Sequence, residues 1–492
     1  MNTTTSSGAS RRNPRRRGPR PDARPSTPGG SGHTSHNHAS VDLSPVTSPV
    51  APAADFTVLN VPEPIVAALV RSGVTVPFPI QTATLPDSLA GRDVLGRGKT
   101  GSGKTIAFAI PVVTRLAESG SRRESKSPRA LVLVPTRELA NQVAEALTPI
   151  AHAMSMKVST IFGGVGQGPQ VTALRLGIDI LVACPGRLED LIAQRHCRLD
   201  KVEVTVLDEA DHMADLGFLP AVKRLLDQTP QGDQRLLFSA TLDNGIDVLV
   251  RRYLSDPVVH SVDPEIAPVS TMTHHVFAVS AADKPTVIRE LAQGMDRALL
   301  FTRTKHGAKK LAKVLSSAGI PAVEMHGNLS QNARERTLEA FTAGTTRVLV
   351  ATDIAARGIH VDDIALVIHV DPPAEHKAYL HRSGRTARAG AEGVVVTLMT
   401  PEQVGDVKSL ARAARIEPTI TRVAPGHTVL TGLVGPTAPL VKYVPQAIEQ
   451  ASPHGGRNGG RNGARRDSNS SARPAATRQN SGRRYGSGTR GR

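Results

Sequence analysis

The sequence has very little of several residue types. Two cysteines among 492 residues cannot build a disulfide scaffold or a four-cysteine zinc site. No apolar run approaches the roughly 18 residues that span a bilayer, and no apolar segment near residue 1 is typical of a secretory signal. Tryptophan is absent and aromatic residues make up 3% of the chain, so ring stacking can contribute little to binding. These scarcities favour a cytoplasmic protein in a reducing compartment, with no membrane partner. The first residues are also rich in Arg, Ser and Thr, as some organelle transit peptides are, but Pro and Gly interrupt any amphipathic helix there, so we favour a disordered tail.

Positive charge is concentrated at the two ends. The formal net charge is +17, of which residues 1–54 contribute +5 and residues 451–492 contribute +9, so the body is nearly neutral. Both ends are rich in Arg, Ser, Gly and Pro and lack large apolar side chains, which predicts disorder. The Gly-Gly-Arg-Asn repeat after residue 454 resembles the Arg-Gly tracts of RNA-binding proteins. Basic tails of this kind favour binding to polyanions, of which nucleic acid is the default.

Between the ends, short runs of β-branched and apolar residues alternate with helical patterns. Continuous apolar strands between helices predict parallel sheets that are buried on both faces, an α/β fold. The runs form two series, Ala130–Val134, Asp179–Ala183, Val204–Leu207 and Leu236–Phe238, then Ala298–Phe301, Arg347–Ala351, Leu366–Val370 and Val394–Leu398. We therefore expect a tail (1–54), a first α/β domain (55–258), a linker (259–272), a second α/β domain (273–420), an unassigned extension (421–450) and a second tail (451–492).

A glycine-rich segment supplies the strongest local signal. Residues 98–105 read Gly-Lys-Thr-Gly-Ser-Gly-Lys-Thr and follow a short apolar run that is expected to be a strand. Such a loop folds its backbone N–H groups around phosphate oxygens at the start of a helix, with Gly101, Ser102 and Gly103 in the cradle. Lys104 would reach the β and γ phosphates, and the Thr105 hydroxyl would bind Mg²⁺. The pattern predicts a nucleoside triphosphate site.

A second signal follows the apolar run 204–207. Asp208 and Glu209 stand at its end, where a carboxylate beside a P-loop holds Mg²⁺. We expect Asp208 to hold the ion, through water, and Glu209 to orient and deprotonate the attacking water. ATP and Mg²⁺ are the expected cofactors.

Together these motifs resemble those of the DEAD-box ATP-dependent RNA helicases, named after the tetrapeptide at 208–211. The resemblance runs from about Phe56 to Pro418 and implies two tandem RecA-like domains flanked by disordered basic tails. Further stretches recur in the order of the family: Gly73 to Gln81, Pro135 to Leu139, Gly163-Gly164, Pro185-Gly186-Arg187, Ser239-Ala240-Thr241, Phe301 to Thr304, Gln331 with Arg334, Thr352 to Gly358 and His381 to Arg388.

The resemblance also implies roles for individual residues. Gln81 would recognise adenine, Gly358 would lie at the nucleotide, and Ser239 and Thr241 would couple hydrolysis to strand separation. The expected RNA-backbone contacts are Thr136, Arg137, Gly164, Gly186, Arg187, Thr304, Arg334 and Thr352. Their hydroxyl, amide and guanidinium groups suit phosphate and ribose, which predicts little sequence preference.

Two arginines near the end of the second series complete the catalytic set. Arg385 and Arg388 are three residues apart, so we expect them to share one helix face and to project from the second domain into the ATP site. The resemblance implies that they are arginine fingers, each of which can be worth roughly 10³-fold or more in rate. Hydrolysis would then require the two domains to close.

The sequence departs from the family at three positions. Val74 stands where an aromatic ring usually stacks on adenine, which predicts weak ATP binding. Phe78 either supplies a ring instead or packs in the core, and we favour core packing. His360 replaces a usual Asp and predicts altered, pH-dependent closure. Cys184 replaces a Thr before Pro-Gly-Arg, either weakening an RNA contact or lying inert in the core.

The expected function is ATP-dependent unwinding or remodelling of short RNA duplexes or RNA–protein complexes. The same motifs would serve an ATP-gated RNA clamp, and the basic tails would serve an RNA chaperone or annealer. Ribosomal or RNA-decay assemblies are possible partners, and no residue chooses between them.

Overall fold

The computed structural model describes residues 53–98, 101–241, 244–262, 272–356, 361, 364–387 and 392–442. Nearly all of both expected tails lies outside these residues. Within them, no helix has the length and apolar character needed to cross a membrane.

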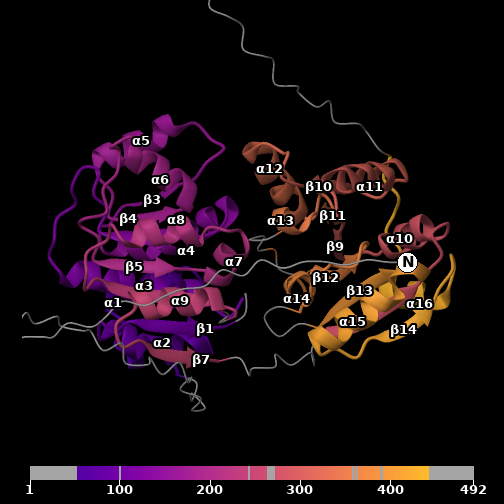
Figure 1. Cartoon of the computed structure of the whole chain (residues 1–492), viewed down its shortest axis with the longest axis horizontal. Helices are drawn as coiled ribbons and strands as arrows, with labels where there is room; N and C mark the ends of the chain where they lie inside the picture. The colour runs from indigo at the N-terminus through magenta and orange to yellow at the C-terminus, as the bar shows by residue number, and fades with distance from the viewer. Residues whose placement is uncertain are drawn as a thin grey trace, which may run out of the picture. The chain divides into compact units, whose positions relative to one another are not determined.

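The first half of the chain forms a seven-stranded sheet in the order β3-β4-β2-β5-β6-β1-β7 (Figure 1). Every pair of neighbouring strands is parallel. The strands are β1 (Val94–Arg97), β2 (Ala130–Leu133), β3 (Val158–Ile161), β4 (Ile180–Ala183), β5 (Val204–Leu207), β6 (Gln234–Ser239) and β7 (Val258–Ser261).

Helices cover both faces of this sheet. Side chains of α1–α4 pack in one hydrophobic cluster with Val132, Val182 and Val206, and those of α5–α9 pack in a second cluster with Leu131 and Leu181. The helical elements are η1 (Thr57–Leu59), α1 (Glu63–Arg71), α2 (Pro79–Leu89), α3 (Lys104–Glu118), α4 (Arg137–Ala153), α5 (Gln167–Leu176), α6 (Pro185–Ala193), α7 (Ala210–Asp215), α8 (Leu219–Leu226) and α9 (Asn244–Tyr253). Alternate strand residues thus enter opposite layers, as burial on both faces requires.

The second half repeats this plan. Its strands lie in the order β10-β11-β9-β12-β13-β8-β14, which is the first order with seven added to every number. All neighbouring strands are again parallel. The strands are β8 (Met272–Ala278), β9 (Arg297–Phe301), β10 (Ala322–Met325), β11 (Val348–Ala351), β12 (Ile364–His369), β13 (Gly393–Met399) and β14 (Thr419–Arg422).

The helices of this second lobe also form two layers. One layer holds α10, α11 and α16, and the other holds α12 to α15. Their bounds are α10 (Lys284–Leu291), α11 (Lys305–Ser317), α12 (Gln331–Thr342), α13 (Asp353–Ala356), α14 (His376–Ser383), η3 (Pro401–Gln403), α15 (Val404–Ala414) and α16 (Thr428–Val434). The prediction of two α/β units with parallel sheets is confirmed, and the architecture is that of tandem RecA-like domains.

All eight strands expected from apolar runs are present, with ends that shift by one or two residues. Two expected segments need correction at their edges. The linker expected over 259–272 includes part of β7, because Val259, His260 and Ser261 pair with β1. The unassigned extension contains the end of β14 and all of α16, whose Leu430 is buried against α10 and the sheet.

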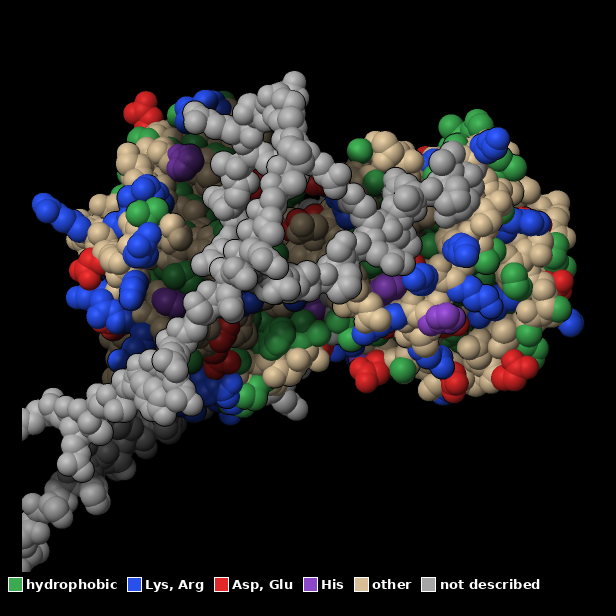
Figure 2. Space-filling view, turned by 90° about the horizontal axis from the view of Figure 1, so that it is seen from above, with side chains coloured by type: hydrophobic (Ala, Val, Ile, Leu, Met, Phe, Trp, Pro, Cys, Tyr) green, Lys and Arg blue, Asp and Glu red, His purple; other side chains and the backbone are tan. Residues whose placement is uncertain are grey.

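Charged side chains are mixed over the surface. Figure 2 shows Lys and Arg scattered across the described part of one face, with Asp and Glu between them. This mixture agrees with the small net charge that the sequence assigns to the body.

Candidate nucleotide and RNA sites

The acidic residues after β5 lie at the carboxyl edge of the first sheet. Asp208 is buried, and its Oδ1 accepts a hydrogen bond of 2.9 Å from the backbone N–H of Glu209. Glu209 has a left-handed backbone (φ 49°, ψ 50°) and precedes α7. A residue other than glycine in this conformation stores strain of order 1–3 kcal/mol, which surrounding contacts must hold.

The two carboxyl groups are pushed in opposite directions. Burial raises the pKa of Asp208 to about 7, against the opposing charge of Lys104. Burial would raise the pKa of Glu209 too, but a hydrogen bond and charge from His212, with charge from Arg385 and Lys104, lower it to about 2. Glu209 is therefore ionised at neutral pH. The positive charge near Asp208 is too small to offset the effect of burial on its carboxyl group.

The phosphate loop joins β1 to α3. Gly101 and Gly103 have φ of +85° and +89°, which side chains rarely adopt, and α3 begins at Lys104. The Lys104 Nζ donates to the carbonyl of Gly98, and the buried Ser102 hydroxyl has no hydrogen-bond partner. A triphosphate could accept hydrogen bonds from both groups, the Lys104 ammonium and the Ser102 hydroxyl.

These residues fit a magnesium ion. The undercompensated Asp208 carboxylate and the Thr105 hydroxyl at the start of α3 are oxygen donors, the type that Mg²⁺ prefers. In the described residues no group of three or more His, Cys, Asp or Glu could hold a metal ion. A site with few protein ligands is usual for Mg²⁺ that is shared with substrate phosphates.

The adenine-side segment differs from expectation. Val74 packs against the core, whereas Phe78 is 45% exposed, so the interpretation of Phe78 as core packing is wrong. A Cβ built on Gly103 would lie 3.1 Å from Cβ and Cδ2 of Phe78, which places the ring beside the phosphate loop. Gln81 is 1% exposed, with Oε1 accepting from Phe78 N–H at 2.9 Å and Nε2 donating to the Gly103 carbonyl at 2.8 Å. Gln81 therefore braces the loop here.

One aspartate links the acidic residues to β6. The N–H of Asp211 donates to Ser239 Oγ at 3.3 Å, and its Oδ2 accepts from the N–H and hydroxyl of Thr241 at 2.9 and 3.0 Å. Ser239 Oγ donates in turn to the Thr241 carbonyl at 2.7 Å. The two expected coupling residues thus contact the same turn that carries Glu209.

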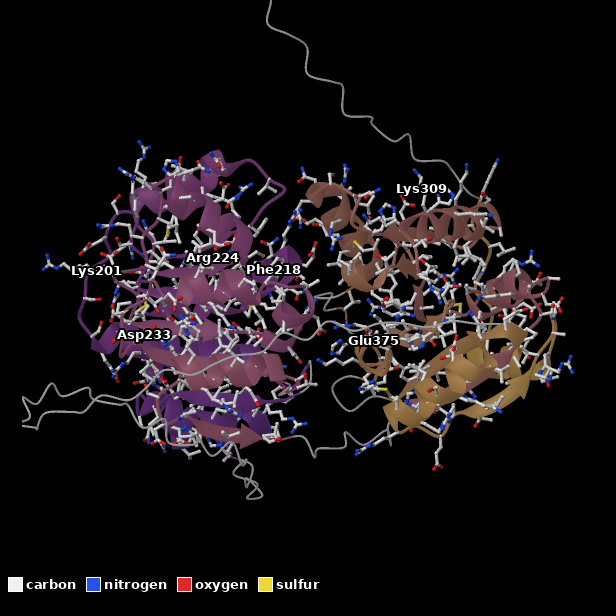
Figure 3. The ribbon with its side chains drawn as sticks, viewed as in Figure 1. Lys201, Phe218, Arg224, Asp233, Lys309 and Glu375 are labelled. Carbon is white, nitrogen blue, oxygen red and sulfur yellow. The ribbon has the colours of Figure 1, made fainter. Side chains whose placement is uncertain are left out.

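Two expected RNA-contacting threonines begin helices. Thr136 Oγ1 accepts from the N–H of Leu139 at the start of α4, and Thr304 Oγ1 accepts from the N–H of Gly307 at the start of α11. Helix N-termini carry partial positive charge that favours phosphate. All four lysines of α11 are exposed, among them Lys309 (Figure 3).

The paired glycines lie beside an arginine. Gly164 has φ +80°, and a Cβ built there would lie 2.1 Å from Arg137 Nη1. The guanidinium therefore covers the bare backbone of Gly164, and these two expected RNA contacts form one surface. Gly186 is exposed in the first turn of α6, and the neighbouring Arg187 forms an ion pair of 3.6 Å with Asp190.

Arg334 is engaged by protein groups. Its side chain is buried, with Nε donating to Glu138 Oε1 at 2.6 Å and Nη2 to the Ala355 carbonyl at 3.3 Å. Thr352 is also buried, directly after β11. Contact of Arg334 and Thr352 with RNA stays a prediction.

Comparison with known proteins identifies the family of this chain. Residues 78–248 match the family model described as DEAD/DEAH box helicase, and residues 283–390 match the helicase conserved C-terminal domain. The ATP-dependent RNA helicase RhlB of Pseudomonas syringae is 39% identical over 326 residues, 65% of this chain and 82% of that relative. The chain belongs to the DEAD-box RNA helicase family.

Other relatives and solved structures extend the comparison. The DEAD-box ATP-dependent RNA helicase CshA of Geobacillus kaustophilus is 36% identical over 362 residues, 73% of this chain and 76% of that relative. The chloroplastic DEAD-box helicase 3A of Zea mays is 40% identical over 72% of this chain, and the chain spans about half, 48%, of that relative. The structure of S. cerevisiae Dbp5 bound to RNA and ADP BeF3 has a TM-score of 0.67 at 26% identity, covering 78% of this chain and all of that one.

One helix expectation for this DEAD-box chain is wrong. Helix α14 ends at Ser383, with Gly384 as its C-cap, so Arg385 follows the helix in a turn and does not lie on a helix face. Arg385 is buried, and its charge reaches Glu209. Arg388, Gly358 and His360 lie outside the described residues.

The third departure has a clear environment. Cys184 precedes α6 and is half-buried, and burial raises the pKa of its thiol to about 12, with the Glu138 charge adding to the effect. A raised pKa keeps the thiol protonated at neutral pH, which favours the interpretation of Cys184 as an inert residue.

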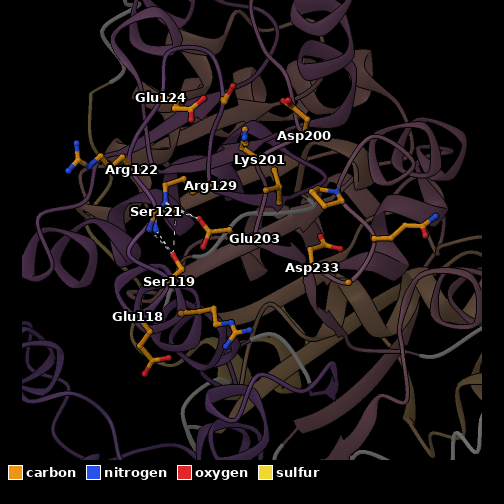
Figure 4. Close-up of a pocket in the computed structure, with 16 residues that line it drawn as sticks. Glu118, Ser119, Ser121, Arg122, Glu124, Arg129, Asp200, Lys201, Glu203 and Asp233 are labelled. Carbon is orange, nitrogen blue, oxygen red and sulfur yellow. Dashed lines mark hydrogen bonds and ion pairs between the residues drawn. The ribbon is translucent and has the colours of Figure 1, made fainter.

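A polar hollow of the first lobe lies away from this site. A cavity of about 620 Å³ lies near the amino ends of β2, β5 and β6, at the opposite edge of the sheet (Figure 4). Arg129 lies at its wall and bonds Ser119, Ser121 and Glu203. Because acidic and basic side chains already pair across this cavity, it offers no phosphate cradle.

Sequence reasoning missed two residues of the acidic turn. Asp211 joins the turn to Ser239 and Thr241, and the only signal for it was its place in the tetrapeptide. His212 contacts Glu209 and had no signal beyond its spacing of three residues from that carboxylate.

Proposed function

We propose that this protein is an ATP-dependent RNA helicase that unwinds or remodels short RNA duplexes or RNA–protein complexes. One observation carries the proposal. The turn after β5 carries the ionised Glu209 carboxylate, which bonds His212. Asp211 in the same turn bonds Ser239 and Thr241, which supports coupling between the expected catalytic carboxylate and the expected coupling residues.

Hydrolysis uses the residues of both lobes. Glu209 orients the attacking water and accepts its proton, while Lys104 binds the β and γ phosphates. Asp208 and Thr105 would hold Mg²⁺, which would neutralise charge on the phosphates when bound. Arg385 adds positive charge as the γ-phosphoryl group leaves, which requires closure of the lobes around ATP, and Arg388 would add to it.

Adenine recognition is assigned to Phe78 rather than to the position of Val74. The exposed Phe78 ring lies beside the loop glycines, where it can stack on a base, and such a stack is worth roughly 1–3 kcal/mol. Gln81 can hydrogen-bond the adenine edge only if its side chain gives up the hydrogen bonds to Phe78 and Gly103. Phe78→Ala should therefore raise the KM for ATP and for GTP alike, because a stacked ring does not distinguish the bases.

RNA binds through its backbone. Thr136, Thr304, Arg137 and Gly164 offer hydroxyl, amide and guanidinium groups and no aromatic ring, which supports recognition without sequence preference. The basic tails add affinity that falls with salt concentration. We place the protein in the cytoplasm, with ribosomal or RNA-decay complexes as its assemblies.

The test is steady-state ATP hydrolysis with and without single-stranded and duplex RNA, followed by strand displacement. Glu209→Gln should lower kcat at least 100-fold without loss of ATP binding, because the amide cannot accept the water proton. Glu118→Gln is the matched control, since Glu118 is exposed at the far end of the helix that Lys104 begins. Hydrolysis that RNA does not stimulate would contradict the proposal.

Strand displacement separates helicase from clamp. RNA-stimulated hydrolysis without displacement would favour an ATP-gated RNA clamp. Deleting 1–54 and 451–492 should leave RNA-stimulated hydrolysis intact, whereas a tail-driven chaperone or annealer would lose its main activity.

A further inference from the structure

The side chain of His212 lies against the catalytic carboxylate. Its Nδ1 is 2.9 Å from Glu209 Oε2, and the residue is 6% exposed. The other ring nitrogen, Nε2, is buried and has no hydrogen-bond partner. The ring's hydrogen bond to Glu209 is therefore the polar contact that fixes its orientation.

Glu209 needs such a restraint. Its backbone is in the left-handed region, and its side chain must present one oxygen to water while its second oxygen is held. An Nδ1–H donor on Oε2 fixes the carboxylate plane and leaves Oε1 for the water. The adjacent Asp211 has a different task, because its carboxylate bonds Thr241 and the N–H of His212.

We propose that His212 is a positioning residue for hydrolysis, which holds Glu209 in its water-orienting conformation through the Nδ1–H to Oε2 hydrogen bond. The inference rests on the proposed ATPase function. It adds a residue outside the tetrapeptide to the hydrolytic machinery. Its effect should appear in kcat and leave the KM for ATP unchanged, since the ring contacts Glu209 and not the phosphate loop.

Two variants of similar shape test the hydrogen bond. His212→Asn places an amide nitrogen where Nδ1 stands, and His212→Leu fills the same space with no donor. A hydrogen bond to a charged group is worth about 10- to 100-fold in rate. His212→Leu should therefore lose 10- to 100-fold in RNA-stimulated kcat, while His212→Asn should stay within about threefold of wild type. Neither should change the KM for ATP or the affinity for RNA more than about threefold.

A double variant adds a control. In a Glu209→Gln background His212→Leu should have little further effect, because the group that it positions is gone. A wild-type kcat in His212→Leu, an equal loss in His212→Asn, or a rise in KM without a fall in kcat would overturn the inference and leave the proposed function standing. A wild-type protein that hydrolyses no ATP would overturn both.

Discussion

Gly164 should be needed for RNA binding because of the arginine that covers it. An alanine at φ +80° is strained by about 1–2 kcal/mol. Its methyl group would lie 2.1 Å from Nη1 and 2.5 Å from Cζ of Arg137, so the guanidinium must leave its place. Loss of one charge-assisted hydrogen bond to phosphate costs about 1.5–3 kcal/mol, roughly 10- to 100-fold in Kd.

The assay is titration of fluorescent single-stranded RNA at fixed salt, together with ATP hydrolysis without RNA. Gly164→Ala should weaken RNA binding about as much as Arg137→Ala, and the double variant should be no worse than either, while hydrolysis without RNA stays unchanged. Gly166→Ala is the control, because Gly166 has φ −57° and no heavy atom near its Cβ position. Wild-type RNA affinity in Gly164→Ala would refute the reasoning.

Three further results are expected. Burial, with the charge of His275 adding to it, lowers the pKa of His274 to about 4, so its stabilising effect is complete above pH 6.5 and is lost as the pH falls toward 4. In urea unfolding, a change from about pH 7.5 to about pH 5 should therefore destabilise wild type by about 2 kcal/mol more than it destabilises His274→Asn, and an equal pH response of the two proteins would contradict this. Burial raises the pKa of both thiols, Cys184 and Cys197, to about 12. DTNB at about pH 8 should therefore label the native protein slowly and the unfolded protein fast, and rapid labelling of the native protein would contradict this prediction. Gly96→Ala would place a Cβ 2.5 Å from the Phe238 ring and should lower stability by about 1–3 kcal/mol in thermal unfolding, an effect that Phe238→Leu should reduce if the contact is the cause.

The sequence predicted the central strands because those strands are buried on both faces. Val204–Leu207 and its neighbours are continuous apolar runs, and the structure confirms them. The missed strands lie at or near sheet edges, as β3, β10 and β14 do. Their sequences mix polar residues with apolar ones, since these strands are only partly buried, so composition alone could not separate them from loops.

The parts of the site that form short motifs of fixed spacing could be predicted from the sequence. The phosphate loop and the acidic pair have fixed spacings that follow from strand–loop–helix geometry. The exposure of Phe78 was not predictable, because it depends on where a loop 25 residues later passes. The end of α14 before Arg385 was missed because Gly384 was taken as part of a motif and not as a helix C-cap.

The repeated strand order has a consequence for the division of labour between the halves. At the place in the second sheet that corresponds to Lys104 and Asp208, Lys284 begins α10 and Asp371 follows β12, and their side chains lie 3.6 Å apart. No glycine-rich loop precedes Lys284, so cation and carboxylate neutralise each other where a triphosphate would otherwise sit. In the first half, Lys104 instead bonds the carbonyl of Gly98 in its own loop, a contact that a triphosphate could replace. Two halves with the same strand order therefore differ, within the described residues, in whether this lysine and this carboxylate pair with each other.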